Sequence, residues 1–334
     1  MAAEETMKPL TMGILGVAEH FRLRVRVPVV GLEEVRIKGV ASRSLERAKV
    51  AAAEWQFEKG YGSYDDLLAD DEIEAVYIPL PNHLHGEWIK KCADAGKHIL
   101  CEKPIDLDQA RAREAVEYAE SKGVLLMEAF MYRFHPQWIR ARELVEIGEI
   151  GAPQAIHTIF TYNNQDPENI RNNPDIGGGA LLDIGCYAVS SARFLLGQEP
   201  SRVVCTIERH PTFGTDSLAS AILDFGGARA LFTVSTAMWP KQQVRVFGTG
   251  GTLAVNLPFN AFPDVPLTVT MENDLGVREI ATGPVDQYAE MFKAFAAAVR
   301  AGGPVPTPPS DALANMKVLD ALFRSAETGR WEEV

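Results

Sequence analysis

Residues 10–21 read LTMGILGVAEHF, an apolar run that ends in a glycine turn. A strand that is apolar at nearly every position is typical of a parallel sheet buried on both faces, and the first such strand leads into the nucleotide-binding turn. Against the pattern G-x-G-x-x-G only Gly16 is kept, because Ala18 and Phe21 occupy the other two glycine positions. Ala18 is small enough for close approach to a pyrophosphate, whereas Phe21 is not. Taken alone, the motif fits a dinucleotide site and a structural turn about equally well.

The first 130 residues repeat this strand pattern, with helical patterns between the strands. The strands are predicted at Leu10–Leu15, Val35–Ala41, Ala75–Ile78, His98–Cys101 and Val124–Phe130, and the helices at Ser44–Trp55, His83–Ala95 and Leu107–Lys122. Strand–helix–strand repetition builds a parallel sheet with helices on both sides. We therefore predict a doubly wound α/β Rossmann domain over residues 1–130.

The remaining residues, 131–334, change to period-two alternation with short glycine turns. Alternating stretches run over Gln154–Tyr162, Arg202–Arg209, Leu218–Phe225, Arg229–Ser235, Val244–Asn256 and Leu267–Glu272. This pattern predicts a large, mainly antiparallel open sheet with one face covered. Helical patterns lie at about 179–196, 287–300 and 310–329. We predict an α+β domain, with the last helix expected to pack back on the first domain.

Composition bounds the function. The chain has 334 residues, a net charge of −12 and 46% hydrophobic residues, which together exclude wholesale disorder and disfavour nucleic acid or an anionic membrane as the partner. Its four cysteines show no C-x-x-C spacing, so reduced thiols are expected. Residues 1–10 lack a signal-peptide pattern, and no 18-residue apolar run is present. These features predict a cytoplasmic protein.

The end of the second predicted strand bears on the cofactor. An acidic residue there binds the ribose 2′-hydroxyl of NAD, but this chain reads Ala41-Ser42-Arg43, with Arg47 one turn later. A hydroxyl and two guanidinium groups suit a 2′-phosphate. The alternative is that Arg43 and Arg47 are solvated helix charges paired with Glu46. Their place at a strand end favours NADP over NAD.

Two further motifs carry candidate chemistry. Glu102-Lys103-Pro104 follows a strand, and its X-Pro bond is a candidate cis peptide, although a surface lysine before a helix-starting proline is the alternative. Asp183 and Tyr187 lie at i and i+4 after a glycine run, on one helix face. A lysine beside a tyrosine stabilises the phenolate, which can then act as a general base or acid. A capped core helix is the alternative interpretation.

The order of these motifs resembles the Gfo/Idh/MocA, or glucose–fructose oxidoreductase, family over nearly the whole chain. The motifs are Pro81-Asn82-His83-Leu84-His85, Glu102-Lys103-Pro104, Tyr132-Arg133-Phe134-His135-Pro136 and the D-x-x-x-Y helix. The resemblance implies catalytic Lys103, Asp183 and Tyr187, and a tyrosine at position 187 is similar to the branch that contains aldose dehydrogenases and dihydrodiol dehydrogenase. It also implies a homodimer or homotetramer formed through the sheet of the second domain.

The resemblance also assigns binding residues. Cofactor contacts are expected from Gly16, Ala18, Glu19, His20, Phe21, Ser42, Arg43, Arg47, Pro81, Asn82, His85, Glu102 and Lys103. Substrate contacts are expected from Lys103, Tyr132, Arg133, Asp183 and Tyr187, with Tyr162 and Trp239 as further aromatic candidates. The chain departs from the family pattern at His20-Phe21, where an alternating arginine segment follows. His83 and His85 lack the additional ligands of a metal site, so no metal is expected.

We therefore predict an NADP(H)-dependent oxidoreductase that transfers hydride between nicotinamide and a carbohydrate hydroxyl or carbonyl, most simply an aldose 1-dehydrogenase of the xylose or glucose type. A ketosugar reductase of the 1,5-anhydrofructose type and a trans-dihydrodiol dehydrogenase are the alternatives within the enzyme class. A non-catalytic NADPH-binding sensor is the alternative from another class, although the joint presence of Lys103, Asp183 and Tyr187 argues against it.

Overall fold

The computed structural model describes residues 8–334, and the chain forms two compact units. The first unit comprises residues up to 106 together with 110–129 and 288–311, and the second comprises 107–109, 130–287 and 312–334. The predicted domain boundary at residues 130 and 131 stays a prediction, as does the packing of the last helix on the first domain. Residues 1–7, which contributed to the expectation about a signal peptide, lie outside the described residues.

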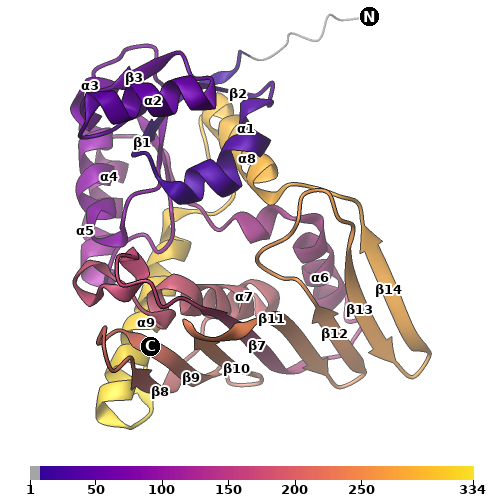
Figure 1. Ribbon diagram of the computed structural model, residues 1–334. Helices are drawn as coiled ribbons and strands as arrows, with labels where there is room; N and C mark the ends of the chain where they lie inside the picture. Colours follow the sequence, from indigo (N-terminus) through magenta and orange to yellow (C-terminus); the bar gives the residue numbers. More distant parts are fainter. Residues whose placement is uncertain (1–7) are drawn as a thin grey trace, which may run out of the picture. The chain divides into compact units, whose positions relative to one another are not determined.

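The first unit holds a six-stranded sheet in the order β3-β2-β1-β4-β5-β6, in which all neighbouring strands are parallel (Figure 1). The strands are β1 (Leu10–Leu15), β2 (Val35–Ala41), β3 (Lys59–Tyr61), β4 (Ala75–Ile78), β5 (His98–Cys101) and β6 (Leu126–Glu128). The order reverses between β1 and β4, which is the switch point where doubly wound sheets bind their ligands. The predicted α/β class is therefore confirmed, and four of the predicted strands have the predicted bounds.

Helices connect these strands, as the periodicity indicated. The helical elements are η1 (Phe21–Val25), α1 (Arg26–Val30), α2 (Leu45–Trp55), α3 (Tyr64–Leu68), η2 (Asn82–Leu84), α4 (His85–Asp94) and α5 (Gln109–Ser121). The Ser44 hydroxyl caps α2 by accepting the Arg47 amide, and the Ser63 hydroxyl caps α3 in the same way. The prediction missed α1 and β3, because each has five residues or fewer and shows too little periodicity.

Helix α8 (Gln287–Ala301) belongs mainly to the first unit although it lies late in the sequence. Its Arg300 forms two hydrogen bonds to the Glu74 carboxylate, at 2.7 and 2.8 Å, just before β4. Phe292 of the same helix packs against Tyr77, with ring centroids 5.2 Å apart. Burial opposes ionisation of Glu74, but the stronger effect of the Arg300 hydrogen bonds lowers its pKa to about 2.

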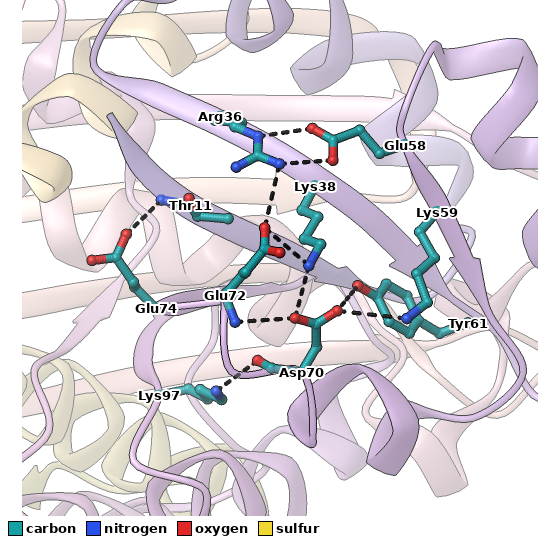
Figure 2. Close-up of polar contacts among 10 residues, drawn as sticks. All are labelled: Thr11, Arg36, Lys38, Glu58, Lys59, Tyr61, Asp70, Glu72, Glu74 and Lys97. Atoms are coloured by element: carbon teal, nitrogen blue, oxygen red, sulfur yellow. Dashed lines mark hydrogen bonds and ion pairs between the residues drawn. The ribbon is translucent and has the colours of Figure 1, made fainter. Parts of the chain in front are cut away.

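An ion-pair network centred on Asp70 closes the edge of the sheet where β4 and β5 begin (Figure 2). The Asp70 carboxylate accepts hydrogen bonds from Lys38 Nζ at 2.8 Å, the Tyr61 hydroxyl at 2.8 Å and the Glu72 amide at 3.0 Å. Lys97 Nζ donates to the Asp70 carbonyl at 3.0 Å. Because cofactors bind at the opposite, carboxyl edge of such a sheet, this network stabilises the fold and is separate from the expected site.

The second unit contains a nine-stranded sheet in the order β14-β13-β12-β11-β7-β10-β9-β8-β15 (Figure 1). The strands are β7 (Pro153–Asn163), β8 (Arg202–Arg209), β9 (Asp216–Asp224), β10 (Arg229–Ser235), β11 (Ala237–Gly248), β12 (Gly251–Val255), β13 (Leu267–Asn273), β14 (Gly276–Thr282) and β15 (Glu332–Glu333). Neighbours are antiparallel except β7 and β10, which are parallel. The mainly antiparallel prediction is confirmed, and the stretch predicted at 244–256 is a hairpin of two strands.

Helical elements of the second unit comprise η3 (Met131–Phe134), α6 (Pro136–Glu146), η4 (Ile170–Asn172), η5 (Pro174–Ile176), η6 (Leu181–Gly185), α7 (Cys186–Leu196) and α9 (Pro309–Thr328). Helix α7 packs against β7 and β10. The segment Pro174–Leu196 is apolar and long enough to cross a membrane, but 89% of its apolar window is buried inside the fold, as in the core helix of a globular protein. The four cysteines are all buried and none forms a disulfide.

Candidate functional site

The turn after β1 has the shape of a nucleotide-binding turn. Gly16 adopts a φ of +110°, which favours glycine, and its amide donates to the Ala41 carbonyl at 3.0 Å. A Cβ atom at this position would lie 2.9 Å from Leu80 Cδ2, so a larger residue would also require the Leu80 side chain to shift. The turn therefore presents main-chain groups at the carboxyl edge of the sheet, where a diphosphate binds in this fold.

Ser42, Arg43 and Arg47 gather where β2 ends, next to that turn. Ser42 is buried, whereas both arginines are exposed. Arg47 donates from Nη2 to the Val17 carbonyl at 3.0 Å, which ties the start of α2 to the turn after β1. Within residues 8–334 neither arginine forms an ion pair with Glu46, although both are solvated as the alternative interpretation expects, so their contact with a 2′-phosphate stays a prediction. One buried hydroxyl and two solvent-facing guanidinium groups fit a 2′-phosphate.

The side chains that follow this turn differ in burial. Glu19 is exposed and forms an ion pair with Arg22, whereas Phe21 is fully buried. The Phe21 ring packs 5.2 Å from Trp55 and 5.8 Å from Tyr77, measured between centroids. Phe21 therefore fills the core of the first unit, which explains a large residue at a position where the pattern has glycine. Its predicted contact with the cofactor stays a prediction, as do those of Ala18 and Glu19.

Glu102 is a buried carboxylate with several donors. Its Oε1 lies 3.5 Å from His20 Nε2 and accepts the Tyr77 hydroxyl, and its Oε2 accepts the Lys103 amide at 3.3 Å. Burial opposes ionisation of Glu102, but the interactions with His20, Lys103 and Tyr77 lower its pKa to about 2. The ionised carboxylate therefore holds the main chain of Lys103 and the imidazole of His20 in place.

The Lys103–Pro104 peptide bond is cis, which is one of the two interpretations that the sequence leaves open for this X-Pro bond. The fully buried His85 fastens this turn, because its Nδ1 lies 2.8 Å from the Pro104 carbonyl and its Nε2 lies 2.8 Å from the Leu80 carbonyl. Burial lowers the pKa of His85, against the effect of these two carbonyl oxygens. The motif at 81–85 is thus joined to the Glu102-Lys103-Pro104 turn by its last histidine. Cofactor contacts by Pro81, Asn82 and His85 themselves stay predictions.

Asp183 is the polar centre of the second unit. Its side chain is 12% exposed, and its Oδ2 accepts hydrogen bonds from the Tyr162 hydroxyl at 2.7 Å and from Arg171 Nε at 3.0 Å. Attraction to Asp183 raises the pKa of Arg171, whereas burial, followed by the Asp183 charge, raises the pKa of Tyr162. The Arg171 charge also interacts with Tyr187. The arrangement is a carboxylate held in one orientation, with a cation and phenols around it.

Buried Asp216 holds the start of the helical segment that carries Asp183 and Tyr187. Its Oδ2 accepts the Leu181 amide at 2.6 Å, so it satisfies one of the unpaired amides at a helix start. Gly179 leaves room for this carboxylate, because a Cβ there would lie 1.9 Å from Asp216 Oδ1. Burial raises the pKa of Asp216 to about 6, although the hydrogen bond from Leu181 opposes the shift.

Tyr187 lies among aromatic side chains. It is 6% exposed, its hydroxyl lies 3.4 Å from Met131 Sδ, and its ring centroid lies 5.1 Å from Phe259. Further rings around it are those of Phe130, Tyr132 and Phe160, at 5.3, 5.9 and 5.7 Å. This packing restricts the phenol ring to one orientation.

The loop that carries Phe259 is fixed by side chains from three other segments. Gln137 Nε2 donates to the Leu257 carbonyl at 3.0 Å, and Gln287 Nε2 donates to the Phe259 carbonyl at 2.7 Å. Gln242 Oε1 accepts the Phe259 amide at 2.9 Å. The ring beside Tyr187 is therefore held through its own backbone.

Tyr132 and Arg133, the predicted substrate contacts, are linked to the helix of Tyr187. The hydroxyl of the buried Tyr132 lies 2.7 Å from Ser190 Oγ, and Arg133 Nη2 donates to the same atom at 2.8 Å. Tyr132 therefore has a packing role, and substrate contact by either residue stays a prediction. The other aromatic candidate, Trp239, is 87% exposed on β11.

No pattern in the sequence points to Arg171, Asp216 or Phe259. None belongs to a motif, and each reaches its partner across more than ten residues of sequence. The glycine run at 177–179 was a usable signal, since glycines that are needed for close approach imply neighbours. Within residues 8–334 no group of three or more His, Cys, Asp or Glu side chains is arranged to hold a metal ion.

Comparison with known proteins gives consistent matches along the chain. Residues 10–130 match the family model described as an oxidoreductase family with an NAD-binding Rossmann fold, and residues 138–254 match the GFO/IDH/MocA C-terminal domain. An uncharacterised oxidoreductase of Rhizobium meliloti is 42% identical over 98% of this chain and 100% of its own. A D-xylose 1-dehydrogenase (NADP(+)) of Haloferax volcanii is 40% identical over 96% of this chain and 98% of its own.

Solved structures show the same likeness. A 3-ketoreductase from Actinomadura kijaniata, in complex with NADP and TDP-benzene, has a TM-score of 0.89 at 30% identity and covers 95% of this chain and 98% of its own. An aldose-aldose oxidoreductase from Caulobacter crescentus, complexed with glycerol, has a TM-score of 0.90 at 25% identity and covers 98% of this chain and 100% of its own.

Proposed function

Because the chain belongs to the GFO/IDH/MocA family of oxidoreductases, we propose that it is an NADP-dependent dehydrogenase that oxidises an aldose at C1. The observation that carries the proposal is the constellation on Asp183, whose carboxylate is oriented by Tyr162 and Arg171 beside Tyr187. A carboxylate, a guanidinium and phenols that lie close together suit a polyhydroxylated substrate. The activity of the Haloferax relative supports the same choice.

The residues at the end of β2 support NADP as the cofactor. Ser42, Arg43 and Arg47 offer a hydroxyl and two cations there, with no carboxylate that would repel a 2′-phosphate or grip the 2′-hydroxyl of NAD. The Gly16 turn would hold the diphosphate. When it is bound, NADP supplies the hydride acceptor of the reaction.

The protein residues supply proton transfer and orientation. In the oxidative direction the Tyr187 hydroxyl oxygen, as phenolate, takes the proton of the substrate hydroxyl, and Asp183 holds a second hydroxyl of the sugar. Lys103 stabilises the phenolate and donates a hydrogen bond to the reacting oxygen. In reduction Tyr187 returns the proton. The rings around Tyr187 exclude water from the phenol.

Reduction of a ketosugar is the second candidate. The Actinomadura 3-ketoreductase, which is 30% identical to this chain and has the same fold, supports this candidate. The same residues would serve either direction of the reaction. The two candidates differ in substrate and not in proton chemistry.

We also propose that two or four copies associate through the sheet of the second unit. A shallow cavity of about 460 Å³ is lined by residues of β7–β10, among them the exposed Ile159. Sedimentation of the purified protein tests the association, and a monomer at all concentrations would contradict it.

The test of the activity is NADPH absorbance with a panel of aldoses, ketosugars and trans-dihydrodiols. We expect the highest kcat/KM for an aldose with NADP, and its loss in Lys103→Met and Tyr187→Phe. Turnover confined to a ketosugar would select the second candidate. A protein that binds NADPH but oxidises or reduces none of the panel would instead be a sensor.

A further inference from the structure

Arg171 enters the surroundings of Asp183 from a loop that no recognised motif includes. It lies in η4, and its Nε donates to Asp183 Oδ2 at 3.0 Å, the same oxygen that accepts the Tyr162 hydroxyl. The guanidinium is planar, so an Nε atom held by Asp183 also fixes the direction of the two terminal nitrogens. Arg171 is therefore an oriented cation beside the proposed substrate carboxylate.

The loop around Arg171 is rigidly attached to the glycine run. The Arg171 carbonyl accepts the Gly179 amide at 2.9 Å, and a Cβ on Gly178 would lie 2.6 Å from that carbonyl oxygen. Next to it, the buried Asn172 donates from Nδ2 to the Asn164 and Asp166 carbonyls at 3.2 and 2.8 Å. The glycines thus let the Arg171 backbone dock against the start of the helical segment that carries Asp183.

The terminal nitrogens of Arg171 have donors to spare. Within residues 8–334 neither Nη1 nor Nη2 donates a hydrogen bond, and the side chain is 36% exposed while that of its partner Asp183 is 12% exposed. A guanidinium whose orientation is fixed and whose terminal N–H groups have no hydrogen bond within the protein can donate to a ligand oxygen.

We propose that Arg171 is a specificity-determining residue whose terminal nitrogens donate to the substrate oxygen next to the hydroxyl held by Asp183. Asp183 and Arg171 together then recognise two neighbouring oxygens, which is the chemistry of a vicinal diol on a sugar. This inference rests on the proposed function and names the part of the sugar that is recognised.

The charge of the pair favours a neutral diol over an anionic substituent. Asp183 neutralises Arg171, since their attraction is the main cause that raises the pKa of Arg171. A carboxylate or phosphate at this place would gain from Arg171 but would be repelled by Asp183. A diol satisfies both, because one hydroxyl donates to the carboxylate and the neighbouring oxygen accepts from the guanidinium.

The test compares a sugar with its deoxy analogues in wild type, Arg171→Gln and Arg171→Lys. Using D-xylose and its 2-, 3- and 4-deoxy analogues with NADP, we expect kcat/KM in wild type to fall about 10- to 100-fold for two analogues, as for loss of a charge-assisted hydrogen bond. One of them lacks the hydroxyl held by Asp183, and the other lacks the neighbouring oxygen held by Arg171. Arg171→Gln loses a similar factor in kcat/KM with D-xylose and no longer discriminates against the analogue that lacks the oxygen held by Arg171. Arg171→Lys keeps the wild-type melting temperature but also loses the discrimination. The matched control is Arg140→Gln, an arginine on α6 paired with Glu143 at 3.0 Å, which keeps wild-type values.

Two results would overturn the proposal. In one, Arg171→Gln retains the wild-type discrimination against every deoxy analogue. In the other, Arg171→Gln keeps the wild-type kcat/KM for neutral sugars and loses activity only with sugar acids. Calorimetric binding of the non-reacting 1,5-anhydroxylitol to the NADP-loaded protein separates this inference from the proposed function. One outcome is that wild type binds 1,5-anhydroxylitol, that Arg171→Gln binds it at least about tenfold more weakly, and that neither protein oxidises a sugar. In that case the proposed function fails, whereas the diol site is supported. If wild type binds no polyol, both fail.

Discussion

Replacing Arg43 and Arg47 by alanine should convert the protein from NADP toward NAD. Both side chains are exposed, Arg43 just after β2 and Arg47 in the first turn of α2, and within residues 8–334 neither forms an ion pair with Glu46. Their roles differ, however, because Arg47 also donates to the Val17 carbonyl at 3.0 Å. Arg43→Ala should therefore affect NADP alone, whereas Arg47→Ala should also loosen the turn after β1 and weaken NAD by a small factor.

The exposure of both arginines sets the size of the effect. A hydrogen bond from a charged group contributes about 1.5–3 kcal/mol, and exposed groups belong at the lower end because solvent and salt screen them. Two such contacts give about 3 kcal/mol, or roughly 100-fold in the Kd for NADP. Removing Arg43 alone gives about tenfold. Ser42, which is buried at the same strand end, is unchanged in all these variants, so we expect part of the preference for NADP to remain.

Fluorescence titration with NADPH and NADH measures both affinities without a substrate. The matched control is Lys49→Ala, an exposed cation on the same helix, and it tests whether any positive charge nearby has the same effect. We expect the double variant to lose about 100-fold for NADPH and less than about threefold for NADH, with Lys49→Ala unchanged for both. Equal losses for the two cofactors, or a Lys49→Ala loss as large as that of Arg43→Ala, would refute the assignment of the 2′-phosphate to these arginines.

Three further variants test the proton chemistry and the stability of each unit. Tyr187→Phe should lower kcat by about 10²- to 10⁴-fold, as for loss of a general acid–base group, and leave the Kd for NADPH unchanged; unaltered turnover would contradict its role. Glu74→Gln should cost about 3 kcal/mol in free energy of unfolding at pH 7, since Glu74 falls from a pKa of 4.5 to about 2 on folding. This stabilisation is present above pH 4.5 and lost as the pH falls to about 2, so urea unfolding of wild type and variant should converge in acid; a constant difference would contradict the linkage. The pH dependence from Asp216 has the opposite sign, because folding raises its pKa from 3.8 to about 6. As the pH rises from 3.8 to about 6, wild type should therefore lose about 3 kcal/mol of free energy of unfolding, and Asp216→Asn should not. Equal pH profiles of stability for the two proteins would show that burial of the charge has no such cost.

The parts of the fold that the sequence predicts are those with a long, regular pattern. The strands β1, β2, β4 and β5 have the predicted bounds because their apolar runs are continuous and end at turn residues. Helix α6 was missed although it has eleven residues, since its buried positions include Gln137 as well as apolar side chains. That glutamine is buried because its amide holds the Leu257 carbonyl, a partner 120 residues away. A polar residue that is buried by a distant partner has no signature in local periodicity.

The same limit applies to the candidate site and shows what the motifs omit. Asp183 and Tyr187 could be identified from their spacing, but a carboxylate on a helix face does not reveal what orients it. Arg171 does so from a loop twelve residues earlier, and only the close contact at Gly178 shows why that loop must lie there. The motif therefore identifies Asp183, Tyr187 and the glycines that admit their neighbours, whereas the neighbours themselves are visible only in the structure. Because Arg171 Nε donates to Asp183 Oδ2, we expect the substrate preference of this protein to depend on Arg171 as well as on the residues of the motif.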